Sequence, residues 1–412
     1  MAKATTADRP YDIILVGATG YVGALIADYL PARAGGNALR WAIAGRNAAK
    51  LDAVKAALGQ RGERLATIVA DTANRSEMDA LATKTKVILS TVGPYAKYGS
   101  ELVAACVDMG TDYCDLTGEP QWIQRMIDLH HEAAAESGAR IVHCCGFDSI
   151  PSDLGVFFLN EEVRKRTGKP CTAIRMRVKS MKGGASGGTI ASVMNMVEEA
   201  VRDSNVRSML ANPYALNPKD ARKGVRQPGS IPVTYDSAAA SWTAPFVMGA
   251  INTRIVHRSN ALMNYAYGRD FQYDEAVMTG GGVLGAPAAL AMTGAMGAFG
   301  LAAAFSPTRA FLNRFVLPKP GEGPTPEQRE RGSYDLLFVG TAVDGRVFKA
   351  RVTGDRDPGY GSTAKMISEA AICLSELSDD IGGGFWTPAS AMGAPLTARL
   401  VEHAGLTFEM VD

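Results

Sequence analysis

The sequence predicts an α/β protein in which a doubly wound parallel sheet is followed by a second, α+β domain. Three observations lead to this prediction. Short apolar runs alternate with helix-length segments over the first 150 residues, a glycine-rich turn follows the first apolar run, and the alternation changes after Ile150. Strands that alternate with helices are typical of a parallel sheet covered by helices on both faces.

The first domain should contain six strands. Residues 12–16 (DIILV) are apolar throughout, as expected of a strand buried on both faces of a sheet. The helix after them should run from about Gly20 to Leu30, because Pro31 lacks the backbone donor that would continue it. Further strands are expected near 40–44, 65–70, 87–91, 112–116 and 139–145, and helices near 48–58, after 76, over 100–109 and over 120–137.

The second domain should begin with a helix that ends at Thr167 and is capped by Ser152 or Asp153. Residues 173–180 alternate apolar and polar side chains, which indicates a half-exposed strand of an antiparallel sheet. We expect a long loop over 212–232, a strand over 343–353 and a helix over 362–377. The predicted parts are a dinucleotide-binding domain (1–154), a substrate or oligomerisation domain (155–355) and a C-terminal segment (356–412) that returns to the first domain.

Composition excludes several classes of protein. The 43 basic and 42 acidic residues give a net charge of +1, which argues against nucleic-acid binding. None of the six cysteines forms a C-x-x-C pair and no histidine has metal-ligand spacing, so we expect neither a metal site nor disulfides. The first ten residues lack the apolar core of a signal peptide, and we expect a cytoplasmic protein with reduced thiols.

Residues 276–308 carry no charged side chain and are rich in alanine and glycine. We predict a helix over 287–305 that is largely buried in the second domain or in a homo-oligomer interface, with its end near lipid or substrate. The second interpretation is an interfacial helix flanked by Arg309, Arg314 and Lys319, which would give peripheral membrane contact. A transmembrane span ranks third because glycine and alanine are only weakly apolar.

The glycine-rich turn is the strongest local signal for function. It reads Gly17-Ala18-Thr19-Gly20-Tyr21-Val22-Gly23 and stands between the first strand and its helix. The first glycine permits a tight turn, the second lets the backbone approach a pyrophosphate, and the third allows close packing of helix on strand. This context predicts a Rossmann fold that binds a dinucleotide at the helix N-terminus. The turn residues predicted to bind the cofactor are Gly17, Thr19, Gly20, Tyr21, Val22 and Gly23.

The end of the second strand predicts which dinucleotide binds. An acidic residue here would favour NAD, whereas this chain has Arg46 and Asn47, followed by Lys50. A guanidinium suits the 2′-phosphate of NADP, so we predict NADP(H). Asp71, at the end of the third strand, should approach the adenine end of the cofactor.

The fourth and sixth strands end in loops that should border the nicotinamide, because they lie at the carboxyl edge of the sheet. Tyr95, Asp148 and Ser149 in these loops are candidates for donating a proton or orienting the substrate. Alternatively, Tyr95 is an aromatic wall and Asp148 caps backbone amides. No Tyr-x-x-x-Lys pair is present, since Tyr360 and Lys365 are five residues apart. The loop residues predicted to contact the cofactor are Thr91, Val92, Gly93 and Pro94.

Four segments resemble the saccharopine dehydrogenase-like oxidoreductases, and within them the branch of trans-acting enoyl reductases of complex-lipid biosynthesis. The segments are WAIAGR (41–46), TVGPYAKYG (91–99), CDLTGEP (114–120) and GFDSIPSDLG (146–155). The resemblance is thinner after residue 170, where GGASGGT (183–189) and TPASAMG (387–393) are similar. It implies a Rossmann domain, a second α+β domain and a nicotinamide cofactor, but not saccharopine as the substrate.

Three functions follow as hypotheses. The first is an NADP(H)-dependent reductase that transfers hydride to an activated C=C of a small-molecule or carrier-bound lipid or polyketide intermediate. The second is a reductase of C=N or C=O bonds in amino-acid-like metabolism. The third is a non-catalytic dinucleotide-binding protein that docks on a membrane or a synthase complex.

Overall fold

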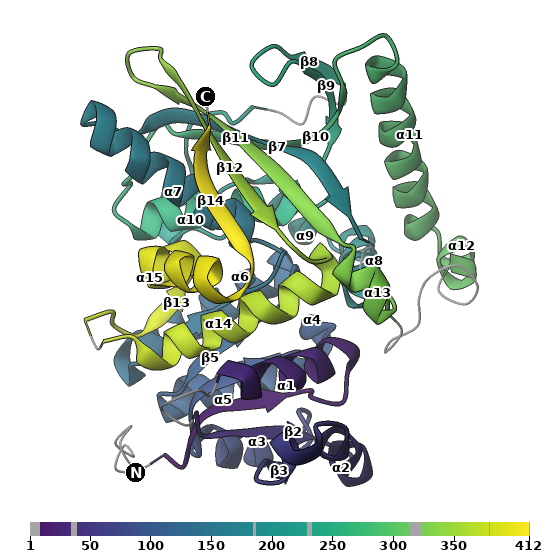
Figure 1. The fold of residues 1–412 in the computed structure, drawn as a ribbon, viewed down its shortest axis with the longest axis vertical. Coiled ribbons are helices and arrows are strands. Elements are labelled where there is room, and N and C mark those ends of the chain that lie inside the picture. The colour runs from purple at the N-terminus through teal and green to yellow at the C-terminus, as the bar shows by residue number, and fades with distance from the viewer. Residues whose placement is uncertain are drawn as a thin grey trace.

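The computed structural model describes residues 9–33, 39–183, 187–228, 233–312, 323–378 and 380–411. These residues form two seven-stranded sheets with helices packed on them. In Figure 1 the strands and helices of the first sheet occupy the lower part of the molecule and the second sheet the upper part, with α14 (Thr363–Glu376) crossing between them. This arrangement confirms the predicted α/β class with a second mixed domain.

The first sheet is entirely parallel, in the order β13-β6-β5-β4-β1-β2-β3. The order reverses between β1 and β4, as in a doubly wound sheet whose ligands bind at that point. The strands are β1 (Tyr11–Val16), β2 (Trp41–Gly45), β3 (Ala66–Val69), β4 (Thr85–Ser90), β5 (Asp112–Asp115), β6 (Arg140–Val142) and β13 (Gly384–Trp386).

Alternate residues of β1 face the two helical layers. Ile13 and Leu15 pack in the cluster that contains side chains of α1 and α14, whereas Ile14 and Val16 pack with α3, α5 and α6. A strand buried on both faces needs apolar residues at every position, which explains the run seen in the sequence. The helices of this domain are α1 (Tyr21–Arg33), α2 (Ala48–Ala57), α3 (Arg75–Ala82), α4 (Tyr95–Tyr98), α5 (Ser100–Met109) and α6 (Pro120–Ser137), with a 3₁₀ turn at Gly59–Gly62.

Two predicted helix boundaries are wrong. Pro31 lies inside α1, which continues to Arg33. Tertiary contacts hold this last turn, because Tyr29 Oη and Arg33 Nε each donate to Glu369 Oε1 at 2.8 Å. The helix α7 (Ile150–Thr167) starts before the predicted caps, with Ser149 at its N-cap position. Asp153 serves other elements instead, since its carboxylate accepts from Ser259 Oγ and from the Ala389 amide.

The second sheet is mixed, in the order β14-β12-β11-β7-β10-β9-β8, and only the pairing of β10 with β7 is parallel among the described strands. The predicted strand at 173–180 lies within β7. The strand expected at 343–353 starts too early, because residues 343–346 form the turn before β12. The other five strands of this sheet, β8, β9, β10, β11 and β14, were not predicted. The strands are β7 (Cys171–Lys182), β8 (Thr234–Asp236), β9 (Ser241–Pro245), β10 (Gln272–Gly280), β11 (Ser333–Ala342), β12 (Val347–Gly354) and β14 (Leu406–Val411).

Helices connect and cover this sheet, and α7 packs against β7, β11, β12 and β14. The predicted loop at 212–232 is irregular over its described part apart from a 3₁₀ turn at Lys219–Ala221, and residues 229–232 lie outside the described chain. The other helices are α8 (Gly187–Arg202), α9 (Ser204–Ala211), α10 (Gly249–Leu262), α11 (Gly285–Ala304), α12 (Ser306–Phe311), α13 (Pro326–Glu330) and α15 (Pro388–His403), with a π-helical turn, η5, at Pro358–Ser362.

The C-terminal segment contributes to both sheets. The strand β13 pairs with β6 in the first sheet, and β14 pairs with β12 in the second. Between them, α14 packs on β1, β4 and β5, and α15 packs on α14 and α7. The last 57 residues therefore connect the two sheets from one side, while the predicted boundaries of the three parts remain a prediction.

The uncharged segment 276–308 contains the end of β10 and the helix α11, which is exposed. Only Gly285, Ala289 and Ala303 are buried, whereas Leu290, Leu301 and Phe305 are between 62% and 69% exposed. The expectation that the second domain buries this helix is therefore wrong. One side of α11 packs on β9, β10 and α8, and the rest stands at the edge of the molecule, on the right in Figure 1.

Among the described helices, α11 is the one long and apolar enough to cross a membrane, with a mean hydropathy of 1.4 over its most apolar window. Of that window, 11% is buried. Arg309 folds back to the carbonyl of Ala303, and the predicted flanking residues Arg314 and Lys319 lie outside the described residues.

Candidate active site

The turn between β1 and α1 leaves no room for side chains at two of its glycines. Gly17 has a φ of +92°, and a Cβ there would lie 2.7 Å from Thr91 Oγ1. A Cβ on Gly23 would lie 2.2 Å from the carbonyl oxygen of Gly17. At Gly20 only that same carbonyl comes near, at 3.4 Å, and both Thr19 and Gly20 are exposed. The turn is thus tight inside and open outside, which fits a dinucleotide pyrophosphate at the N-terminus of α1.

The next two turn residues point toward the second domain. The Tyr21 ring meets Tyr360 edge-on, with ring centroids 4.7 Å apart. Its hydroxyl donates a hydrogen bond to the carbonyl of Pro324 and accepts one from the Arg329 guanidinium. Val22 lines the cavity described below. The structure therefore places both residues between the glycine turn and the segment around η5.

The residues after β2 include two exposed cationic side chains, those of Arg46 and Lys50. Arg46 is exposed, and its guanidinium makes no hydrogen bond or ion pair with the described residues. The Asn47 side chain caps α2 by accepting from the Lys50 amide at 3.0 Å, and Lys50 is exposed. Asp71 accepts from the amide of Ala73 at 3.1 Å. Arg46 and Lys50 are thus free to meet a phosphate, whereas Asn47 and Asp71 already shape their turns.

The loop after β4 lies against the glycine turn. Thr91 Oγ1 donates to the carbonyls of Val16 and Gly17 at 3.3 and 3.2 Å, and Val92 would contact any Cβ on Gly17. A cis peptide joins Gly93 to Pro94. Thr91, Gly93 and Pro94 line the same cavity as the glycine turn, so the structure brings these predicted cofactor residues together.

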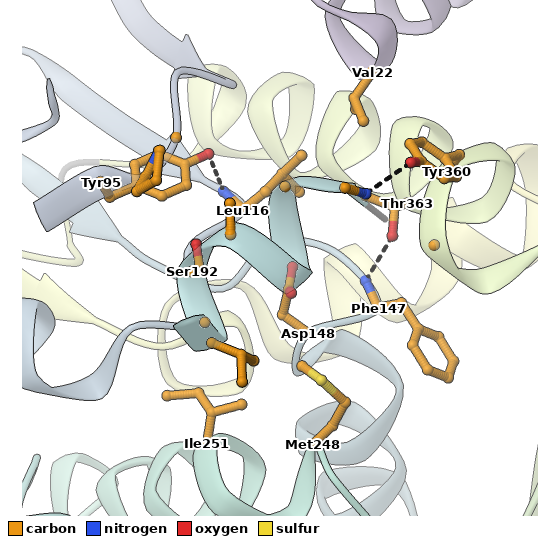
Figure 2. Close-up of a pocket in the computed structure, with 18 of the residues that line it drawn as sticks. Val22, Tyr95, Leu116, Phe147, Asp148, Ser192, Met248, Ile251, Tyr360 and Thr363 are labelled. Atoms are coloured by element: carbon orange, nitrogen blue, oxygen red, sulfur yellow. Dashed lines mark hydrogen bonds between the residues drawn. The ribbon is translucent and has the colours of Figure 1, made fainter. Parts of the chain in front are cut away.

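The cavity has a volume of about 390 Å³ and lies between the two sheets. Figure 2 shows Val22 of α1 on one side of it and Met248 and Ile251 on the other. Among the described residues that line it, Asp148 carries the only charged side chain. The apolar part of the wall comes mainly from Leu116, Phe147, Met181, Val193, Met196, Phe246, Val247, Met248 and Ile251.

Asp148 points into the cavity (Figure 2). No other described residue donates a hydrogen bond to its carboxylate. Burial first, and then the nearby charge of Asp115, raise the pKa of Asp148 to about 7. A carboxyl group with this pKa holds its proton in a large fraction of molecules at neutral pH, so it can act as a general acid.

Tyr95 also lines the cavity, but its hydroxyl is occupied. It donates to the carbonyl of Ser90 and accepts from the amide of Leu116, both at 3.1 Å. Burial, reinforced by Asp115, raises the pKa of Tyr95 well above its usual value. The ring packs on Trp122 at a centroid distance of 5.6 Å. These contacts support the aromatic-wall interpretation over proton donation.

Ser149 does not line the cavity. Its side chain is fully buried, and its hydroxyl donates to Asn252 Oδ1 at 2.9 Å. Asn252 in turn donates to Ser152 Oγ and to Glu275 Oε2. Ser149 thus belongs to a buried polar network between α7, α10 and β10.

Several residues that line the cavity were missed from the sequence. Tyr360 of η5 accepts from the Gly187 amide of α8 at 3.0 Å, and Thr363 Oγ1 accepts from the Phe147 amide at 3.0 Å. Both contacts join segments more than 170 residues apart in the chain. A proline–glycine cluster, PGYGS, was the available signal for an unusual backbone at η5, but nothing local connects it with Phe147.

Comparison with known proteins agrees with this site. Residues 13–142 match the family profile described as "Saccharopine dehydrogenase NADP binding domain", which confirms NADP(H) as the cofactor of the first domain. The apo saccharopine dehydrogenase (L-Glu forming) of Saccharomyces cerevisiae superposes with a TM-score of 0.54. The match covers 98% of this chain and 100% of the yeast chain at 12% sequence identity, so it shows a similarity of fold.

Curated relatives are similar over almost the whole chain. Proteins named trans-acting enoyl reductase from Mycobacterium bovis and Mycobacterium ulcerans are 39% and 40% identical, over 96% of this chain and 96% and 97% of theirs. Rv2449c of Mycobacterium tuberculosis, which bears the same name provisionally, is 43% identical over 96% of both chains. On this similarity, the chain belongs to the family of the mycobacterial trans-acting enoyl reductases.

Proposed function

We propose that this protein is an NADPH-dependent enoyl reductase, which reduces the activated C=C of a lipid or polyketide intermediate presented as a thioester. One observation carries the proposal: the cavity between the two sheets, which we call the reductive cavity, joins the glycine turn to an apolar wall, and its described lining residues include one carboxyl group, that of Asp148, whose pKa is raised to about 7. The names of the relatives support the same reaction.

The cavity wall favours an acyl chain over an amino-acid-like substrate. Methionine side chains such as Met181, Met196 and Met248 adapt to irregular apolar ligands. A zwitterionic substrate would bring a carboxylate and an ammonium group into the same space, and a buried charge without a partner is costly. Because Asp148 is the only charged lining group among the described residues, no cation of the wall could pair with that carboxylate.

The chain's own residues have two tasks in this reaction. The glycine turn and Arg46 would hold NADPH, which when bound supplies the hydride that adds to the β-carbon of the enoyl group. Asp148, in its protonated form, donates the proton that adds to the α-carbon, so that the double bond becomes a single bond with two new C–H bonds. Tyr95 and Thr363 keep the loops around Asp148 in place through their main-chain hydrogen bonds.

A panel of enoyl thioesters and cyclic imines, with NADPH oxidation followed by absorbance, tests the proposal. We expect turnover of enoyl thioesters and none of imines. Turnover of imines alone would overturn the proposal in favour of C=N reduction. Tight NADPH binding without oxidation by either class would instead indicate a non-catalytic dinucleotide-binding protein.

We also propose that the exposed face of α11 is covered when the enzyme works in the cytoplasm, by a second copy of the chain or by the surface of a membrane. The large exposed fractions of Leu290, Leu301 and Phe305 support this proposal, since contiguous apolar surface favours association.

A further inference from the structure

A second, larger cavity adjoins the reductive cavity. It has a volume of about 1070 Å³ and shares Phe246, Val247 and Ala250 with the reductive cavity. These three residues belong to the connection from β9 to the first turn of α10. In Figure 2 this connection, marked by Met248, lies across the reductive cavity from Val22 of the cofactor turn. A ligand could therefore extend from the nicotinamide side into the second cavity.

The second cavity is basic where the first is apolar. Five cationic side chains line it, against the two carboxylates of Asp274 and Glu275. Asp274 pairs with Arg177 at 2.5 Å, and Glu275 accepts from Tyr273 and Asn252. The cationic residues are Arg177, Arg222, Lys223, Arg226 and Arg254.

Three of these cations have no carboxylate partner among the described residues. Lys223 and Arg226 are exposed on the loop that follows α9, and neither side chain makes an ion pair there. Arg254 of α10 is only 5% exposed, its terminal nitrogens donate to the carbonyls of Ala250 and Leu210, and its Nε has no hydrogen-bond partner. The other two cations are paired: Arg177 forms ion pairs with Asp236 and Asp274, and Arg222 forms one with Asp128.

Uncompensated cations around a cavity favour an anionic ligand, and arginine and lysine are the usual partners of phosphate. A molecule that spans both cavities would have an apolar acyl end, a reactive middle and a phosphate-bearing end. Acyl thioesters carried on a phosphorylated arm have this chemistry, whether the arm belongs to a free coenzyme or to a carrier protein.

We propose that the second cavity binds the phosphate of the thioester's carrying arm, with Lys223, Arg226 and Arg254 as its anion-binding residues. The inference rests on the proposed function for the identity of the ligand. It adds a site on elements other than those that carry the glycine turn and Arg46. The phosphates of NADP(H) are expected at the first sheet, beside the glycine turn and Arg46.

Binding of 4′-phosphopantetheine and of pantetheine to the NADP⁺-saturated protein, measured by calorimetry, tests the site without turnover. We expect the phosphorylated compound to bind at least about tenfold more tightly, with an advantage that shrinks as salt rises. The double variant Lys223→Glu/Arg226→Glu should lose this advantage. Lys219→Glu, an exposed charge reversal four residues before Lys223 that lines neither cavity, should keep it.

Equal binding of the two compounds by the wild-type protein, or an advantage that survives in the double variant, would overturn the inference. Retained NADPH affinity in the double variant would show that its first domain is folded. Reduction of an enoyl thioester that lacks phosphate tests the proposed function separately, since that substrate does not need the second cavity. Comparing KM for enoyl-coenzyme A and for the same chain on a carrier protein then identifies the source of the arm.

Discussion

At the scale of single residues, Asp148 differs from the other candidates in what surrounds its polar atoms. The hydroxyls of Tyr95 and Ser149 are each occupied by protein partners, whereas no other described residue donates a hydrogen bond to the Asp148 carboxylate. Sequence reasoning could place all three near the carboxyl edge of the sheet, but it could not predict which hydroxyls fold back onto main-chain or buried partners. Those partners, Ser90, Leu116 and Asn252, are set by tertiary packing.

The first prediction concerns the proton. Asp148→Asn should lower kcat by about 10²–10⁴-fold, the usual contribution of a general acid, with little change in NADPH affinity. Because the pKa of Asp148 is raised to about 7, wild-type kcat should be high below pH 7 and fall as the pH rises through 7. Steady-state kinetics between about pH 5.5 and 8.5 would measure both the loss of kcat in Asp148→Asn and the fall of the wild-type kcat with pH.

Ser149→Ala is the comparison for this experiment, since it removes the hydroxyl of the neighbouring candidate residue. Its pH profile should keep the wild-type midpoint, because the Ser149 hydroxyl donates to Asn252 away from the cavity. A wild-type rate in Asp148→Asn, or a midpoint that moves only in Ser149→Ala, would contradict the role of Asp148.

The second prediction concerns Arg46. Arg46→Asp should weaken NADPH binding by about 10–100-fold, because a charged hydrogen bond contributes about 1.5–3 kcal/mol and the new carboxylate repels the 2′-phosphate. NADH binding should change little or improve. Fluorescence titration with both cofactors measures the ratio, with Lys55→Asp later in α2 as the matched charge change. An unchanged preference for NADPH in Arg46→Asp would place the 2′-phosphate elsewhere.

At the scale of elements, the two halves of the chain differ in whether nearby or remote residues determine where a helix or strand lies. Two helices of the first sheet end at a glycine of their own: Gly110 and Gly138 take up the left-handed backbone after α5 and α6. These boundaries were therefore predictable. The second sheet depends on remote pairings, with β7 between β11 and β10, so β11 was missed although its residues are largely buried.

Helix α7 shows how a correct element can have a wrong boundary. Ser152 and Asp153 have the side chains of good helix caps, yet both lie in the first turn of the helix and are buried. Asp153 joins α7 to α10 and α15 by accepting from Ser259 and from the Ala389 amide. A partner 236 residues away cannot be read from local sequence.

The third prediction follows from this junction. Burial raises the pKa of Asp153 to about 7, above its usual 3.8, so the folded protein holds this proton more tightly than the unfolded chain. The stability that this proton provides is complete below about pH 4 and is lost as the pH rises toward 7. Asp153→Asn should therefore flatten the decline in unfolding free energy between pH 5 and 7, which urea denaturation at several pH values would measure.

Asp148 and Glu275, whose pKa values are also raised to about 7, contribute a decline of the same sign, so the variant should reduce the slope without abolishing it. Exposed Asp220→Asn is the control and should keep the wild-type slope. A slope in Asp153→Asn equal to that of the control would mean that Asp153 is ionised in the folded protein at pH 5.

At the scale of the whole molecule, the active site exists only where the two sheets meet. The cofactor turn comes from the first sheet, the apolar wall largely from α8 and the β9–α10 connection, and η5 closes the cavity from the C-terminal part of the chain. The first-domain motifs predicted the cofactor because they form one edge of one sheet. The substrate side could not be predicted in the same way, since its residues come from α8, the β9–α10 connection and η5, which lie far apart in the sequence.

The exposed helix α11 concerns how the whole molecule meets its surroundings, and it is the subject of the last prediction. Phe299 is 36% exposed and lines neither cavity, whereas Met296 lines the second cavity and is a less specific probe. If a second copy or a membrane covers α11, Phe299→Asp should weaken self-association or liposome binding while leaving NADPH affinity intact. NADPH affinity should be kept because α11 packs on β9, β10 and α8 of the second domain, whereas the glycine turn belongs to the first sheet.

Val343→Asp is the matched control, since Val343 is 57% exposed in the turn between β11 and β12, outside the uncharged segment. Analytical ultracentrifugation and sedimentation with liposomes would distinguish a second copy of the chain from a membrane as the partner of α11. Loss of a dimer in Phe299→Asp but not in Val343→Asp would identify a second copy, and loss of liposome binding would identify lipid. A wild-type protein that is monomeric, binds no liposomes and is unaffected by Phe299→Asp would show that α11 is stable in water uncovered, because its alanines and glycines expose too little apolar area to drive association.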